Sequence, residues 1–154
     1  MEAKAYVIQE AKEVCGQAQL LLQSRLEYCL SSVVSKALVL VFGEDAYEFQ
    51  INFNTRADQT IEAIPVLTRD GEEYDPITMT GGGVVDTVSF ALRVACLMLS
   101  GKEDRVLVLD EPCKHLSADR WEAFKCMMEE LSHQLQIQFI AVTHSPELIG
   151  EGEG

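Results

Sequence analysis

Residues 106–112 read Val-Leu-Val-Leu-Asp-Glu-Pro, so that four apolar residues lead directly to the adjacent carboxylates of Asp110 and Glu111. Continuous Val and Leu runs are typical of strands buried on both faces, and ligands of α/β sheets bind beyond the carboxyl ends of such strands. At that place Asp110 could hold Mg²⁺, and Glu111 could orient or deprotonate a water that attacks a phosphate. Taken alone, the pattern fits equally well a strand that stops at a solvated acidic turn.

Residues 80–87 place three consecutive glycines before a stretch with helical periodicity. A helix start offers unpaired N–H groups and a positive dipole end, and glycines let an anion approach the backbone. The candidate phosphate seat comprises Thr80, Gly81, Gly82 and Gly83, with a plain glycine turn as the alternative. Apolar side chains then recur at steps of three and four residues, at Val88, Ala91, Leu92, Ala95, Cys96 and Leu99.

Residues 139–145 form a third segment, in which the apolar run 139–142 is followed by Thr143, His144 and Ser145. An imidazole at the end of a strand can hydrogen-bond a phosphate or the attacking water. An ordinary, partly buried histidine is the alternative for this position.

Taken together and in this order, the segments resemble the C-terminal lobe of an ABC-type ATPase head from the SMC, RecF and SbcC group of DNA-repair proteins. In that resemblance residues 80–83 correspond to the signature loop, residues 116–119 to the D-loop and His144 to the switch histidine, while Asp110 and Glu111 correspond to Walker B. The resemblance covers residues 80–149. It implies ATP and Mg²⁺ as cofactors, Asp110 as the Mg²⁺ ligand, Glu111 and His144 as catalytic residues, and a nucleotide-binding set of Thr80, Gly81, Gly82, Gly83 and Ser117.

Three positions depart from the usual pattern of this group. Thr80 stands in place of Ser, Gly83 in place of Glu or Gln, and Ser117 in place of the D-loop Asp. Thr80 keeps a hydroxyl that could bond a γ-phosphate, whereas Gly83 has no side chain to reach across a dimer. Such variants resemble SbcC-like ATPases encoded by bacteriophages.

No G-x-x-x-x-G-K-[ST] sequence occurs in the 154 residues, because Gly101 and Lys102 are followed by Glu103. Without a P-loop lysine and its backbone cradle, a triphosphate lacks its principal binding site. We therefore expect an ATP hydrolase that is inactive alone. In the SMC and SbcC group the P-loop lies in an N-terminal lobe beyond a long coiled coil, so we expect a C-terminal lobe that is either a shortened piece or a product working with a companion chain.

The first 37 residues predict one long helix, since only Gly16 interrupts good helix formers. A seam at alternating steps of four and three residues comprises Val7, Ala11, Val14, Ala18, Leu21, Arg25 and Tyr28. We interpret residues 1–37 as a coiled-coil arm, with an ordinary amphipathic surface helix as the alternative. Residues 38–149 are then the head lobe, and residues 150–154, which include no large apolar side chain, are expected to be disordered.

Between the arm and the glycines the sequence predicts a small antiparallel β layer. Apolar and polar residues alternate over 47–54, residues 60–68 form a neighbouring strand that Pro65 makes an edge or irregular one, and a turn at 69–72 leads to a short third strand. The fold class is therefore α/β: a mainly parallel sheet with flanking helices, preceded by this layer and the long helix. After the D-loop, a packed helix face comprises Trp121, Phe124, Met127, Met128 and Leu131.

Composition favours one intracellular domain. The chain has 154 residues and 47% hydrophobic content, enough for a sizeable core. It shows no uninterrupted run of 18 apolar residues and no apolar leader, and its five cysteines lack CxxC spacing, so we expect a cytoplasmic protein without a membrane span. The net charge of −13 predicts that this lobe alone binds DNA poorly.

The resemblance also implies partners. Two heads would sandwich two ATP molecules, and the partners would be an N-terminal Walker A lobe, a second head, an SbcD-like nuclease, and DNA held by the assembled complex; no membrane is expected. A competing hypothesis is a non-catalytic docking or regulatory module with the same fold, and a further one is an unrelated α/β protein with a fortuitous Asp-Glu strand. Retention of Asp110, Glu111 and His144 argues against a pure scaffold.

Overall fold

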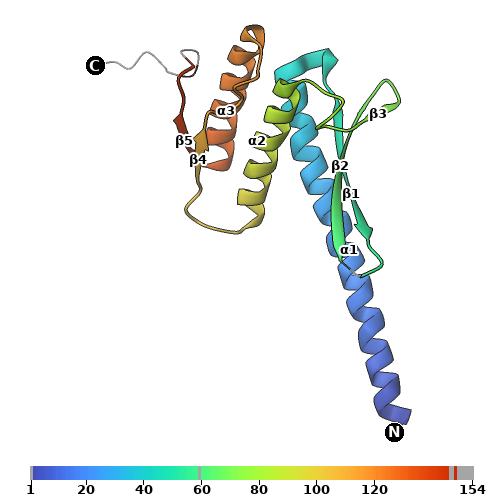
Figure 1. Cartoon of the computed structure of the whole chain (residues 1–154). Helices are drawn as coiled ribbons and strands as arrows, with labels where there is room; N and C mark the ends of the chain where they lie inside the picture. Colours follow the sequence, from blue (N-terminus) through green and yellow to red (C-terminus); the bar gives the residue numbers. More distant parts are fainter. Residues whose placement is uncertain (1, 59, 146–147, 149–154) are drawn as a thin grey trace.

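The computed structural model describes residues 2–58, 60–145 and 148. Figure 1 shows the long helix at the N-terminus, a hairpin sheet lying along it, and a second group of helices and strands beside them. In chain order the elements are α1 (Glu2–Phe42), the 3-10 turn η1 (Gly43–Asp45), β1 (Glu48–Thr55), β2 (Ile61–Arg69), β3 (Glu72–Tyr74), α2 (Gly82–Leu99), β4 (Val106–Asp110), the 3-10 turn η2 (Ala118–Arg120), α3 (Trp121–Leu135) and β5 (Gln138–Val142).

Strands β1, β2 and β3 form the predicted antiparallel layer, in that order. Phe49 of β1 faces Leu67 of β2, and both side chains are fully buried. Pro65 lies in the middle strand of the sheet, but β3 pairs only with residues 67–69, so the outer edge of β2 is open beside the proline. The Ser35 hydroxyl of α1 bonds the Phe49 backbone at both its N–H and its carbonyl, which fastens the layer to the helix.

Strands β4 and β5 pair in parallel, with Asp110 opposite Val142 at their carboxyl ends. One face of this pair packs into the core, where Leu109 is 1% exposed. The other face carries apolar side chains that are 43–65% exposed: Val106, Val108, Ile140 and Val142. The prediction of a strand buried on both faces is therefore wrong for the described part of the chain, because the helices of that part cover a single face.

The core of this second group forms between α2 and α3. The rings of Phe90 and Phe124 meet edge to face at 5.1 Å between centroids, and Trp121 stacks edge-on against Phe124. The packed face predicted for residues 121–131 is confirmed, with Trp121, Phe124, Met127 and Met128 buried and Leu131 partly buried. This core holds the glycine-led helix α2 next to the β4 strand end.

Helix α1 ends at Phe42, five residues beyond the predicted boundary at residue 37. The extension forms because this last part packs on the rest of the molecule, with Val34, Ala37, Leu38 and Val41 buried. The predicted seam nearer the N-terminus is exposed: Val7, Val14, Leu21 and Tyr28. Figure 1 shows the N-terminal end of α1 extending beyond the hairpin of β1 and β2.

Two helical stretches among the described residues, Tyr6–Asp45 and Gly82–Leu99, are long and apolar enough to cross a membrane by length and composition alone. The absence of an uninterrupted apolar run of 18 residues did not predict these two stretches, because single charged residues interrupt both of them. In α2 part of the apolarity serves core packing, since Val88, Ala91, Val94 and Ala95 are buried.

Candidate functional site

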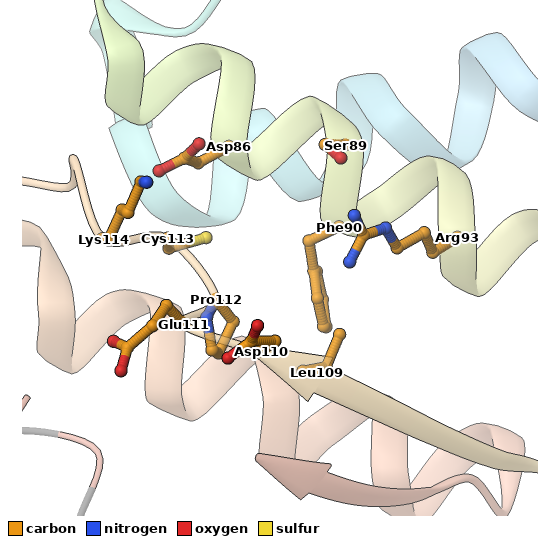
Figure 2. Close-up of a pocket in the computed structure, with 10 residues that line it drawn as sticks. All are labelled: Asp86, Ser89, Phe90, Arg93, Leu109, Asp110, Glu111, Pro112, Cys113 and Lys114. Atoms are coloured by element: carbon orange, nitrogen blue, oxygen red, sulfur yellow. The ribbon is translucent and has the colours of Figure 1, made fainter. Parts of the chain in front are cut away.

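The acidic pair lies where β4 ends. Asp110 closes the strand with an exposed side chain, and the Glu111 N–H donates to the Val142 carbonyl at 2.8 Å, which carries the parallel pairing one step beyond the strand. Glu111 has a φ of 45°. A positive φ costs a non-glycine residue energy and turns the chain sharply. In Figure 2 the Glu111 carboxylate points away from α2.

The Glu111 carboxylate is held by the segment that follows β5. Its Oε1 accepts the His144 N–H at 3.1 Å and lies 2.7 Å from Nδ1 of the same residue, while Oε2 accepts the Thr143 hydroxyl at 3.2 Å. Because a carboxylate only accepts, the imidazole donates its proton in this pair. The hydrogen bond from His144 is the largest influence that lowers the pKa of Glu111. Glu111 is therefore in its basic, charged form and is oriented by His144.

The glycines open α2, but the residue at its N-cap is Gly81, which has extended backbone angles. The Thr80 hydroxyl donates to the Pro76 carbonyl at 2.6 Å. Its proton is therefore used inside the preceding turn, and a phosphate could receive it only if that bond broke. The first N–H groups of the helix remain the natural anion donors of this segment.

A cavity of about 190 Å³ lies between residues 86–93 of α2 and the residues 109–114 at the end of β4 and in the loop that follows it. Figure 2 shows its lining side chains, with Asp86, Ser89 and Arg93 on α2 facing Asp110 and Lys114. Carboxylates and cations from both walls therefore share one small polar cavity, which lies beside the carboxyl end of β4. The structure thus brings the acidic pair and residues 86–93 of α2 to one cavity, whose lining does not include the glycines 81–83.

Asp110 shares the lining of this cavity with the carboxylates of Asp86 and Glu111. Within the described ranges, no group of three or more His, Cys, Asp or Glu side chains could hold a metal ion by itself. Mg²⁺ commonly keeps several waters and takes one or two carboxylates together with phosphate oxygens. Asp110 fits that kind of site and does not fit a metal cage built from protein side chains alone.

Ser117 lies at the N-cap of η2, at the far end of the loop that starts with the acidic pair. The nearby Ser117 hydroxyl is the largest influence that lowers the pKa of Asp119. Two residues earlier, the loop backbone rests directly on the glycines: a Cβ placed on Gly83 would lie 3.2 Å from the His115 carbonyl oxygen and from Leu116 Cα. The Ser117 loop and the glycine segment are therefore in contact.

The sequence interpretation missed three contributors to this arrangement. Thr143 donates to Glu111, and Asp86 and Arg93 line the cavity. The sequence does contain a signal for Asp86 and Arg93. They are the only charged residues of α2 and stand seven residues apart, which puts them on one helix face. Thr143 was read as part of the strand end without a role.

No protein-family model matches the chain. Among curated proteins, the lipoprotein-releasing system ATP-binding protein LolD of Saccharophagus degradans is 33% identical over 72 residues, which make up 47% of this chain and 28% of LolD. The matching part of the chain is thus a fraction of that relative.

Solved structures of SMC heads match over most of the chain. The Smc head domain with a coiled coil and joint from Pyrococcus yayanosii has a TM-score of 0.70 at 16% identity, over 97% of this chain and 28% of that one. The Smc head bound to the C-winged helix domain of ScpA has a TM-score of 0.63 at 16% identity, over 82% of this chain and 37% of that one.

A further SMC structure, described for the ATP-driven dimerisation and DNA-stimulated activation of SMC ATPases, has a TM-score of 0.60 at 15% identity, over 86% of this chain and 77% of that one. At these identities the likeness concerns the fold. The long helix, the antiparallel layer and the parallel strand pair therefore form an α/β lobe of the ABC type, and the chain resembles part of an SMC-type ATPase head.

Proposed function

We propose that this chain supplies the Walker B lobe of an SMC- or SbcC-type ATPase head, which binds and hydrolyses ATP after a Walker A lobe completes the site. The observation that carries the proposal is the Glu111–His144 pair beside Asp110, at the carboxyl ends of two adjacent parallel strands. Such strand ends are the usual ligand sites of α/β sheets, and a base oriented by an imidazole suits water activation.

Each residue has a proposed task in this site. Asp110 would bind Mg²⁺ on the phosphates, directly or through water, and Glu111 would orient the attacking water and accept its proton. His144 would hold the Glu111 carboxylate and face the γ-phosphate. Bound Mg²⁺ would neutralise charge that develops on the phosphates. Thr80, Gly81, Gly82, Gly83 and Ser117 would contact the nucleotide held by a second head.

The parallel sheet itself supports the need for a Walker A lobe. Parallel strands are ordinarily covered on both faces, yet β4 and β5 expose Val108 and Val142 by 65% and 61%. Among the described residues only these two strands form the sheet. A lobe that adds strands to the sheet and covers this face would bring a P-loop beside Asp110 and Glu111.

The finer assignments follow the same proposal. Residues 1–37 would form an arm of an antiparallel coiled coil, continuous with the head lobe 38–149 through the packed end of α1. A second head would join through ATP, and an SbcD-like nuclease and DNA would bind the assembled complex in the cytoplasm. An origin among phage SbcC-like repair ATPases would account for the residues at positions 80, 83 and 117. The tail expected to be disordered, residues 150–154, lies outside the described residues.

The test is calorimetric titration with Mg·ATP. We expect no measurable binding to the chain alone and micromolar binding to a stoichiometric mixture with, or a fusion to, an SMC- or SbcC-type Walker A lobe. In that assembly Glu111→Gln should bind ATP, dimerise and lose at least about 100-fold in turnover, since general-base catalysis contributes about 10²–10⁴-fold. Glu129→Gln, an exposed α3 residue, is the matched control and should turn over normally. Rapid hydrolysis by the Glu111 variant would refute its role as base.

A non-catalytic docking or regulatory module is the second candidate. It is favoured by the start of α2, where a glycine occupies the N-cap and the Thr80 hydroxyl already donates to Pro76. A seat without a free hydroxyl would hold a γ-phosphate less firmly. If the assembled lobes form a stable complex but bind no Mg·ATP, this candidate replaces the first.

A further inference from the structure

The glycine segment and the loop before Ser117 approach each other more closely than side chains would permit. A Cβ on Gly82 would lie 2.8 Å from the His115 Cβ, and one on Gly83 would lie 3.2 Å from the backbone at His115 and Leu116. Distances below 3.0 Å do not occur between real Cβ atoms and their neighbours, so Gly82 has to be glycine while His115 keeps its place. The two glycines thus serve an internal contact as well as an approach to a ligand.

Asp86 fastens this contact from the next turn of α2. Its Oδ2 accepts the His115 N–H at 3.0 Å and lies 3.1 Å from His115 Nδ1. A single carboxylate oxygen thereby fixes both the backbone and the ring of one loop residue. The side chain of Asp86 is 22% exposed, which protects the pair partly from water.

A second connection runs through the buried side of the same helix. Thr87 is fully buried, and its hydroxyl donates to the Gly83 carbonyl at 2.8 Å. Cys113, which precedes His115 by two residues, is buried in the core. The loop is therefore anchored on both sides of Lys114, by the burial of Cys113 and by the hydrogen bonds of His115 to Asp86.

We infer that Asp86 is a positioning residue that joins the glycine segment 80–83 and the loop 115–119 into one rigid unit. The inference rests on the proposed function, in which both segments contact the nucleotide of a second head. Joined segments would present Gly82 and Ser117 to that head at a constant separation, so that ATP-driven dimerisation would not have to order each of them independently. Ordering a loop residue costs conformational entropy, and a preformed contact avoids that cost at the moment of binding.

Amide hydrogen exchange of the chain itself tests the unit directly. In Asp86→Ala we expect the His115 amide to exchange about tenfold faster or more, as loss of a hydrogen bond to a charged group predicts. Because the segments are joined, the amides of Leu116 and of Val84, in the first turn of α2, should also exchange faster. Alanine is the best helix former, so α2 itself is not expected to melt.

Three variants serve as controls. Asp58 is matched to Asp86, because one of its oxygens also accepts both a backbone N–H and a side-chain group, those of Thr60, in a turn far along the chain. Asp58→Ala should leave exchange at positions 84 and 115–116 unchanged. Asp86→Asn keeps an acceptor oxygen and should retain most of the protection, and His115→Asn, whose amide can donate where Nδ1 lies, should retain more than His115→Ala.

The outcomes separate this inference from the proposed function. If Asp86→Ala alters only the His115 amide, or none, there is no rigid unit and the inference is wrong whatever the chain binds. In the assembly with a Walker A lobe, Asp86→Ala should weaken ATP-driven dimerisation at least about fivefold, and Asp86→Asn should weaken it less. If Asp86→Ala speeds amide exchange but dimerises like the wild type, Asp86 has no positioning role. If no assembly binds ATP, the wild type included, the proposed function alone is refuted.

Discussion

At the scale of single residues, Glu111 combines a positive φ with a carboxylate held by three donors. Strained backbone persists where the surroundings determine it, and here the Thr143 hydroxyl, the His144 N–H and the His144 ring provide that determination. The base of the proposed reaction is thus oriented before any nucleotide binds. Binding would need to release or share these hydrogen bonds.

The first prediction concerns the pKa of Glu111. The bond from His144 lowers it, so the folded state holds the proton less tightly than the unfolded chain does. This contribution to stability is complete above the ordinary glutamate value of about 4.3 and is lost as pH falls through the lower folded pKa. His144→Ala should therefore raise the pKa of Glu111 toward its ordinary value in an NMR titration of the carboxyl carbon. Thr143→Val should raise it less, and equal pKa values in all three proteins would contradict the pairing.

The second prediction concerns Cys113. Burial, followed by the charge of Asp86, raises the pKa of this thiol to about 12. The reactive thiolate is therefore negligible at pH 8. Alkylation followed by peptide mass spectrometry should modify the exposed Cys15, Cys96 and Cys126 and leave Cys113 unmodified until urea unfolds the chain. Modification of Cys113 at the rate of the exposed thiols would show that the loop after β4 opens freely.

At the scale of elements, the end of α1 is tied to the start of α3. Arg120 donates to the Phe42 carbonyl at 3.1 Å and lies 3.4 Å from the Asp45 carboxylate. A cation at a helix C-terminus pairs with orphan carbonyls and with the negative end of the dipole. No local pattern in the sequence indicates this tie, because it joins residues 78 apart.

The third prediction follows from this tie. Arg120→Ala should lower the free energy of unfolding by about 1–2 kcal/mol, given the worth of charged hydrogen bonds and of helix-end cations. Urea denaturation measures the loss, and amide exchange should locate faster opening in the last turn of α1. Lys125→Ala removes another cation from the same region and should change stability by less than about 0.5 kcal/mol. Equal effects of the two substitutions would mean that the tie contributes nothing specific.

At the scale of the whole molecule, the two sheets differ in how far their apolar faces are buried. The antiparallel layer buries Phe49 and Leu67 against α1, while the parallel pair β4–β5 leaves an apolar face open. Apolar faces of this kind mark a surface for association. The same reasoning applies to the N-terminal end of α1, which extends beyond the other elements in Figure 1 and carries the exposed apolar side chains of Val7, Val14 and Leu21.

The fourth prediction uses this open face. The chain alone should self-associate and bind the dye ANS, and the double substitution Val108→Thr with Val142→Thr should reduce both without a large loss of stability, because neither side chain belongs to the core. Sedimentation velocity and dye fluorescence are the measurements. Val39→Thr, at an exposed apolar position on α1, is the control and should have a small effect. If sedimentation and dye fluorescence are unchanged in the double variant, the association surface lies elsewhere.

Local pattern was sufficient for much of the architecture. The order of helices and strands follows from spacing that each segment carries within itself, such as the alternation at 47–54 and the three-and-four steps after the glycines. The meeting of Glu111 and His144 was also accessible, since the carboxyl ends of neighbouring parallel strands share one edge. In each case the information lies within one segment or in a general rule of sheet geometry.

Only the tertiary structure decided the features that depend on distant neighbours. The long helix continues to Phe42 because residues beyond 37 find a core to pack on, and the Thr80 hydroxyl is already used because it donates back to Pro76. The contact of Asp86 with His115 joins residues 29 apart, and periodicity carries no information about such a pair. Sequence alone therefore determined which elements form and which polar residues follow the two parallel strands. Packing determined where the long helix ends, which face of the strand pair stays exposed and which side chains bond one another.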